Sequence, residues 1–136
     1  MSPTSSDGWR DVARERASDA DALLSRRQRS AGSVYLAGYA IECSLKAFLQ
    51  RRGMPFPTAG GAGHDLRGLW LQSGFRLGDL SDASGAKTFF IKDWSTDLRY
   101  EVAPSLPCSA PELVGGARQL SGWIQTQIRR QRSPRR

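Results

Sequence analysis

Residues 30–52 read SAGSVYLAGYAIECSLKAFLQRR, and their apolar side chains would surround most of the circumference of a helix. A helix that is apolar nearly all round is buried against other elements. Gly53 and Pro55 then mark a stop. We therefore expect this segment to form the central helix of the fold, with Gly38 allowing a neighbouring helix to come close.

The segments at the two ends of the chain have the spacing of amphipathic helices. Over residues 7–28, apolar side chains recur every three or four positions, and Ser6 or Asp7 can cap the start. The same spacing runs to residue 128 after Ser109-Ala-Pro-Glu112, which fits a capping box with proline in the first turn. Both segments are predicted to pack against the central helix.

The middle of the chain is less regular. Short helices are expected over 64–73 and 83–94, with loops over 53–63 and 101–108, where glycine and proline accumulate. No segment alternates apolar and polar residues with period two. The sequence thus predicts an all-α protein, an up-and-down bundle of four to five helices.

The 136 residues suit one domain, and their net charge of +7 is concentrated at the C-terminal end. We expect a disordered leader over 1–6, a helical domain over 7–128 and a basic tail over 129–136. Five arginines in the tail leave only +2 for the rest of the chain. Such a tail can neutralise nucleic-acid phosphates, or it can simply be solvated and keep the protein in solution.

Several function classes are excluded by composition. One histidine and two cysteines, Cys43 and Cys108, cannot build the usual structural zinc sites or a disulfide scaffold. We expect no metal and no cofactor, and Cys43 should act as a small hydrophobe. No apolar run would span a bilayer, and the start lacks the pattern of a secretory signal, so a cytoplasmic location without membrane attachment is expected.

Four polar residues form a line within the apolar central helix: Tyr35, Tyr39, Glu42 and Lys46. Spacings of four, three and four place them on one face, with Glu42 preceding Lys46 in the favourable i,i+4 order. A charge pair on a buried helix needs partners. The line is therefore an exposed edge of the bundle, the polar floor of a groove, or a subunit contact.

The stretch Tyr35-Leu-Ala-Gly-Tyr-Ala-Ile-Glu-Cys-Ser-Leu-Lys-Ala-Phe-Leu49 closely resembles the signature helix of HEPN domains, named for nucleotide binding in higher eukaryotes and prokaryotes. Shorter elements agree in order: Ala-Arg-x-Arg-Ala-Ser-Asp-Ala over 13–20, His64-Asp65-Leu66, and Trp94 followed by Arg99-Tyr100. The resemblance covers roughly residues 9–128 and points to the small stand-alone prokaryotic type.

The resemblance implies a helical bundle, often a homodimer, with a connection to RNA. Many members are metal-independent ribonucleases of toxin–antitoxin and phage-defence systems, often beside a nucleotidyltransferase-like partner, and others are non-catalytic binding modules. The family's nuclease motif has four to six residues between arginine and histidine. This chain departs from that motif, because its only histidine, His64, lies twelve positions after the nearest upstream arginine, Arg52.

Cleavage of RNA without a metal needs a base, an acid and positive charge beside the phosphate. Here His64 and Arg99 would have to converge in space to act as the catalytic pair. Alternatively, His64 caps the helix that follows it, Arg99 pairs with Glu42 or Asp65, and Trp94 is a core residue. The expected RNA- or nucleotide-binding residues are Tyr39, Glu42, Lys46, Asp65, Trp94, Tyr100, Arg129, Arg130 and Arg132.

Two other functions fit the same residues. The chain can be a non-catalytic, dimeric interaction module whose active partner is encoded elsewhere, which the missing arginine-to-histidine spacing favours. It can also be a nucleic-acid-binding protein whose affinity comes mainly from the arginine tail.

Overall fold

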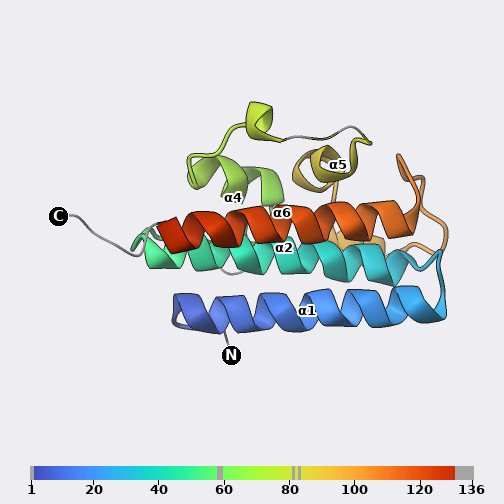
Figure 1. Cartoon of the computed structure of the whole chain (residues 1–136), viewed down its shortest axis with the longest axis horizontal. Helices are drawn as coiled ribbons and strands as arrows, with labels where there is room; N and C mark the ends of the chain where they lie inside the picture. The colour runs from blue at the N-terminus through green and yellow to red at the C-terminus, as the bar shows by residue number, and fades with distance from the viewer. Residues whose placement is uncertain (1, 58–59, 81, 83, 131–136) are drawn as a thin grey trace.

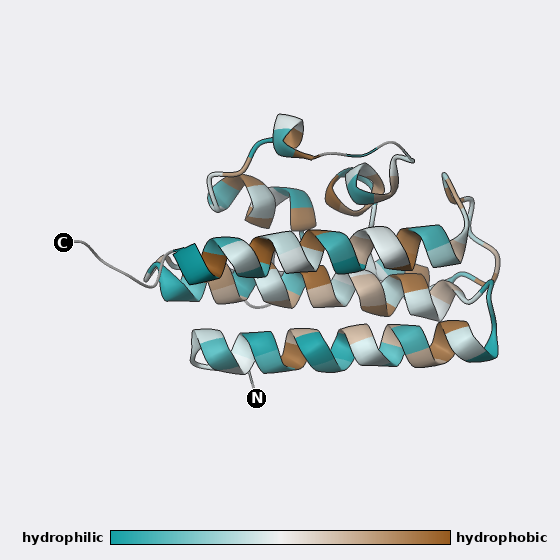
Figure 2. Cartoon of the chain, viewed as in Figure 1, coloured by the Kyte–Doolittle hydropathy of each residue, from teal (hydrophilic) through white to brown (hydrophobic). Residues whose placement is uncertain are grey.

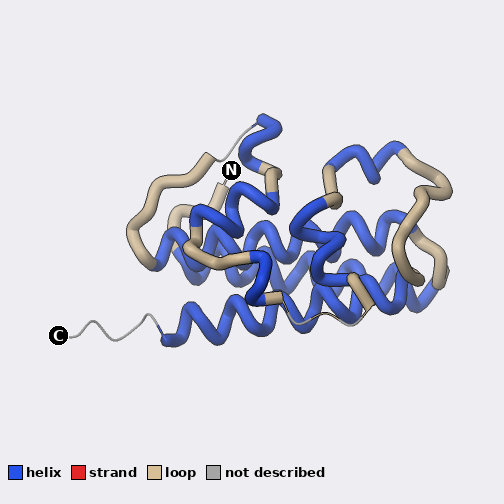
Figure 3. The backbone as a smooth tube through the Cα atoms, turned by 90° about the horizontal axis from the view of Figure 1, so that it is seen from above, coloured by secondary structure: helices blue, strands red, loops and turns tan. Residues whose placement is uncertain are grey.

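The computed structural model describes residues 2–57, 60–80, 82 and 84–130, and all regular structure within these ranges is helical (Figures 1 and 3). This confirms the all-α prediction. The elements in chain order are α1 (Ser6–Arg26), α2 (Ala31–Arg51), α3 (Gly60–Gly63), α4 (Leu66–Gln72), the 3₁₀ turn η1 (Leu77–Asp79), α5 (Ala86–Lys92), the 3₁₀ turn η2 (Thr96–Tyr100) and α6 (Ala110–Arg130).

Three long helices run alongside one another (Figure 1). α1 is antiparallel to α2, and α6 runs in the same direction as α2. Between α2 and α6 in the chain, where an up-and-down bundle would have its third long helix, this protein has two short helices, α4 and α5. α4 packs on α2, and α5 packs on α6. α2 contacts α1, α6, α4 and η2, and is therefore the central helix that its apolar circumference predicts.

The structure corrects the predicted start of α1. Ser5, in an extended conformation, is the N-cap, and its hydroxyl accepts a hydrogen bond from the Gly8 backbone N–H at 3.0 Å. Ser6 is already helical and donates its hydroxyl to the Ala47 carbonyl at 2.8 Å. The prediction that Ser6 or Asp7 caps the helix is therefore wrong by one or two positions, because Ser6 instead bonds to α2.

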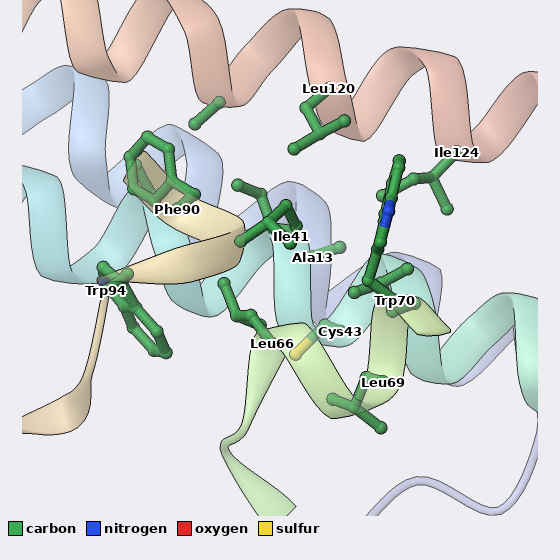
Figure 4. Close-up of a cluster of buried hydrophobic side chains, with 14 of the residues drawn as sticks. Ala13, Ile41, Cys43, Leu66, Leu69, Trp70, Phe90, Trp94, Leu120 and Ile124 are labelled. Atoms are coloured by element: carbon green, nitrogen blue, oxygen red, sulfur yellow. The ribbon is translucent and has the colours of Figure 1, made fainter. Parts of the chain in front are cut away.

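The central helix begins after Ser30, whose hydroxyl accepts from the Ser33 N–H at 3.2 Å. Fifteen of its residues are buried, so it contributes more core than any other described element. Gly38 allows a close approach to α2, as predicted, but the group that approaches is the Trp94 side chain rather than a neighbouring helix. A Cβ at position 38 would overlap the indole of Trp94, which lies across α2 (Figure 4).

The short elements differ most from prediction. Within the predicted loop, residues 60–63 form the single turn α3, and α4 starts at Leu66 rather than at His64. α5 is seven residues long, well short of the predicted 83–94. Gly85 precedes it with a positive φ of 81°, and the N–H groups of Lys87 and Thr88 are bonded instead by the Asp82 carboxylate.

The last helix begins as its sequence predicts. The Ser109 hydroxyl accepts from the Glu112 N–H at 3.2 Å, and the Glu112 carboxylate accepts from the Ser109 N–H at 3.3 Å, which completes the capping box. Figure 2 shows apolar residues recurring along α6 toward the bundle. Its buried stripe is Leu113, Val114, Ala117, Leu120, Ile124 and Ile128, as predicted.

No helix in the part of the chain that the structure describes is long and apolar enough to cross a membrane. α6 extends through Arg130, two residues beyond the predicted domain end. Arg132 and the other arginines of the predicted tail beyond position 130 lie outside the described residues.

Candidate functional site

A buried carboxylate, Glu42, lies at the centre of the polar line on α2. Its Oε2 accepts a hydrogen bond from Lys46 Nζ at 2.9 Å, and its Oε1 lies 2.9 Å from His64 Nδ1. The side chains of Glu42 and Lys46 are each 2% exposed, whereas that of His64 is 36% exposed. The pair is therefore sealed from solvent and reaches the surface through one imidazole.

Local structure explains how these three side chains meet. Glu42 and Lys46 are one helical turn apart on α2. The α3 turn then brings His64 back over Glu42, with the His64 N–H bonded to the Gly61 carbonyl at 3.2 Å. Lys46 Nζ also lies 5.0 Å from the ring centroid of Trp9 on α1. This cation–π contact adds to the ion pair in offsetting the cost of burying the ammonium group.

The hydrogen bond to Glu42 determines the tautomer of a neutral His64. A carboxylate only accepts hydrogen bonds, so Nδ1 must carry the proton that faces Oε1. Nε2 then holds a lone pair, on an imidazole whose side chain is 36% exposed. A carboxylate-oriented imidazole of this kind can act as a general base, and Lys46 balances the charge of the carboxylate behind it.

The α2 residues next to Glu42 form a second, weakly solvated group. Burial raises the pKa of Tyr39, and the nearby Cys43 and Glu42 raise it further, while the positive charge of Arg16 acts in the opposite direction. Burial likewise raises the pKa of Cys43 to about 12. The Tyr39 phenol therefore stays protonated near neutral pH and can donate a hydrogen bond, and Cys43 is an inert thiol.

The other end of the polar line is aromatic. Tyr35 stacks on Trp94 with ring centroids 6.0 Å apart, and meets Tyr39 edge-on at 6.2 Å. The Arg99 guanidinium lies 5.8 Å from the Tyr35 ring centroid and 5.2 Å from that of Tyr100. Arg99 Nε donates to the Thr96 carbonyl at 3.0 Å. The result is an exposed cation held on an aromatic surface.

The residues predicted to form one polar groove thus lie in two separate groups. His64 joins Glu42 and Lys46, while Arg99 and Tyr100 gather at Tyr35, seven residues or about 10 Å along the axis of α2. Within the described ranges no carboxylate pairs with Arg99, so the expected pairing with Glu42 or Asp65 is wrong.

The remaining predicted residues have different environments. Asp65 is exposed at the N-cap position of α4, and Trp94 is 6% exposed within the core, as its core interpretation required. Arg129 and Arg130 lie in the last turn of α6. The interpretation of the whole line as an exposed edge is wrong, because Glu42 and Lys46 are buried and Tyr35 and Tyr39 are half-buried.

Sequence reasoning missed Arg16 as a residue of this site. It lies in the 13–20 segment of α1, and its charge acts on both Tyr39 and Cys43, which flank Glu42. The signal was its position: Arg16 follows the buried Ala13 by three residues and precedes the buried Ala20 by four, which is the spacing of one helix face. Its Nε forms an ion pair with Asp19 at 3.0 Å.

No family model, no curated protein and no solved structure matches this chain. Within the described residues, no group of three histidine, cysteine, aspartate or glutamate side chains could hold a metal ion.

Proposed function

We propose that this chain is a HEPN-like protein that binds RNA or a nucleotide over the face of α2 marked by His64, and cleaves RNA without a metal ion. The observation that carries the proposal is the contact of 2.9 Å between His64 Nδ1 and the buried Glu42 carboxylate. A buried, charge-balanced carboxylate is costly to maintain. Its effect here is to present one imidazole nitrogen to a ligand in a defined orientation.

The neighbouring groups supply the other requirements of the reaction. His64 Nε2 removes the proton of a ribose 2′-hydroxyl, and the oxygen attacks the adjacent phosphorus to form a 2′,3′-cyclic phosphate. The bond from phosphorus to the 5′-oxygen breaks, and His64 returns the proton to that oxygen. The charge that develops on the phosphate needs a cation, and Arg16 is the arginine whose field reaches the residues flanking Glu42. Glu42 and Lys46 are buried, so they position His64 and do not contact the ligand.

The resemblance to HEPN domains extends the proposal to the cellular setting. It supports a homodimer that belongs to a prokaryotic toxin–antitoxin or defence module, with a nucleotidyltransferase-like protein as a partner. The expected ligand contacts from α2, α4 and η2 are Tyr39, Asp65 and Tyr100, and Arg99 would stack on a base or bind a phosphate at the Tyr35 end.

A cleavage assay tests the proposal. Purified protein is incubated with total RNA in the presence of a chelator, beside His64→Gln, Glu42→Gln and the control Arg99→Gln. We expect His64→Gln to abolish cleavage and Glu42→Gln to reduce it by about 10- to 100-fold, as for other lost orienting partners. Arg99→Gln would remove a ligand contact but no reacting group, so it should weaken RNA binding and retain most cleavage at saturating RNA. Cleavage by all proteins alike would remove His64 as the catalyst.

A second candidate is the non-catalytic interaction module. Two large apolar side chains at and just after the end of η2 are strongly exposed, Tyr100 at 77% and Val102 at 94%. Val102 lines a surface cavity of about 560 Å³ together with Ala103, Pro104 and Leu106. Apolar exposure of this kind suits a protein contact. Absence of cleavage by the wild-type protein in the same assay would favour this candidate.

A further inference from the structure

Three arginines from the three long helices meet at one end of the bundle. Arg10 on α1, Arg51 in the last turn of α2 and Arg129 in the last turn of α6 line a surface cleft of about 290 Å³, together with Ile128. Figure 1 shows that the start of α1 and the ends of α2 and α6 lie at this same end. In Figure 2, α2 and α6 both finish there in hydrophilic turns.

Helix dipoles account for two of these charges but not for the third. Arg51 and Arg129 lie at helix C-termini, where a cation is stabilised, but Arg10 lies near the positive N-terminal end of α1. Its Asp7 partner is 3.6 Å away and 86% exposed, which makes a weak ion pair. Three like charges around one cleft therefore leave an excess of positive potential.

The hydrogen-bonding capacity of the cleft is also largely unused. Arg51 has no hydrogen bond or ion pair with any described residue, and Arg10 Nε is buried with no hydrogen-bond partner among them. Arg129 donates to Thr126 at 3.1 Å and retains other N–H groups. Guanidinium groups in this number match the several oxygens of a phosphate better than a single carboxylate.

We propose that the cleft between Arg10, Arg51 and Arg129 binds a phosphate group, either in the backbone of an RNA strand or on a free nucleotide. This site is separate from the one at His64. Position 51 follows Glu42 by nine residues, which is two and a half helical turns, so the two side chains leave α2 on opposite sides. Arg130 follows Arg129 in the last turn of α6 and would extend the contact to a neighbouring phosphate.

The test is the affinity of the full chain for a short fluorescently labelled single-stranded RNA, measured by anisotropy over a range of salt concentrations. We expect the triple variant Arg10→Gln, Arg51→Gln, Arg129→Gln to lose on the order of tenfold in affinity. The slope of log K against log salt should fall by ~0.7, the value for one phosphate contact on a single strand. The single variant Arg51→Gln, which removes no described contact, should lose about threefold in affinity and lower the slope by less than the triple variant does.

The charge-matched control is Arg14→Gln, Arg26→Gln, Arg67→Gln, three exposed arginines outside the cleft. It should remain within about threefold of wild type. Equal losses in the two triple variants, or no loss in either, would overturn the proposal. Displacement of the RNA by AMP would assign the cleft to a nucleotide phosphate, and displacement only by unlabelled RNA to the backbone. This readout is binding and requires no cleavage, so failure of the cleft proposal is distinguishable from failure of the proposed nuclease.

Discussion

A buried carboxylate is tolerated when its charge is balanced and both of its oxygens are hydrogen-bonded. Glu42 meets both conditions, through Lys46 on one oxygen and His64 on the other. The spacing along residues 35–46 predicted the Glu42–Lys46 pair and its need for a further partner. It could not predict which side chain that partner would be, because His64 is 22 residues away and its approach depends on the α3 turn.

A second residue-scale requirement is the absence of a side chain at position 38. A methyl group there would overlap the Trp94 indole, so Gly38→Ala must displace that ring and should lower the free energy of unfolding by about 1–3 kcal/mol. Gly122→Ala is the matched control, because it is also helical but faces open space. It should raise stability by up to about 1 kcal/mol. Urea denaturation of both variants checks this, and a neutral Gly38→Ala would contradict the described packing.

At the scale of elements, the long helices were predictable and the short ones were not. α2 and α6 each have 21 residues and repeat an apolar pattern over several turns. A single residue that does not fit the pattern therefore changes the helix prediction little. α5 has two turns, and its N-terminus is bonded by Asp82, which lies three residues before Gly85. A cap supplied across a glycine-containing turn has no fixed sequence spacing, which is why the predicted 83–94 helix was too long.

The Asp82 cap predicts a pH-dependent contribution to stability. Burial alone would raise the pKa of Asp82, but hydrogen bonds from Thr88 and Lys87 outweigh it and hold this pKa below its ordinary value. A pKa lowered by folding contributes stability above the unfolded pKa, and this is lost as the pH falls through the folded pKa. Asp82→Asn should therefore destabilise the protein by about 0.5–1 kcal/mol at neutral pH.

In acid below that folded pKa, the protonated Asp82 and the asparagine variant should be equally stable, since neither side chain is charged. Thermal unfolding of the two proteins across this pH range measures the difference. A gap that persists unchanged at low pH would show that the carboxylate charge does not bond to the start of α5.

At the scale of the whole molecule, the bundle has two polar regions on opposite sides of α2. One is the Glu42–His64 site beneath the α3 turn, and the other is the cleft lined by Arg10, Arg51 and Arg129. Sequence reasoning found parts of each, namely the stripe on α2 and the arginines at the end of α6. It could not assemble Arg10 or Arg16 into either, because the rotation of α1 about its axis depends on packing against α2 and α6.

The central claim is that Glu42 orients His64 with Nδ1 protonated and Nε2 free. The chain has one histidine, so its imidazole signals in a ¹⁵N–¹H NMR spectrum need no further assignment. In mildly alkaline buffer, where an imidazole is ordinarily neutral, we predict the Nδ1–H tautomer in the wild type and its loss in Glu42→Gln. Observation of the Nε2–H tautomer in the wild-type protein would contradict the account.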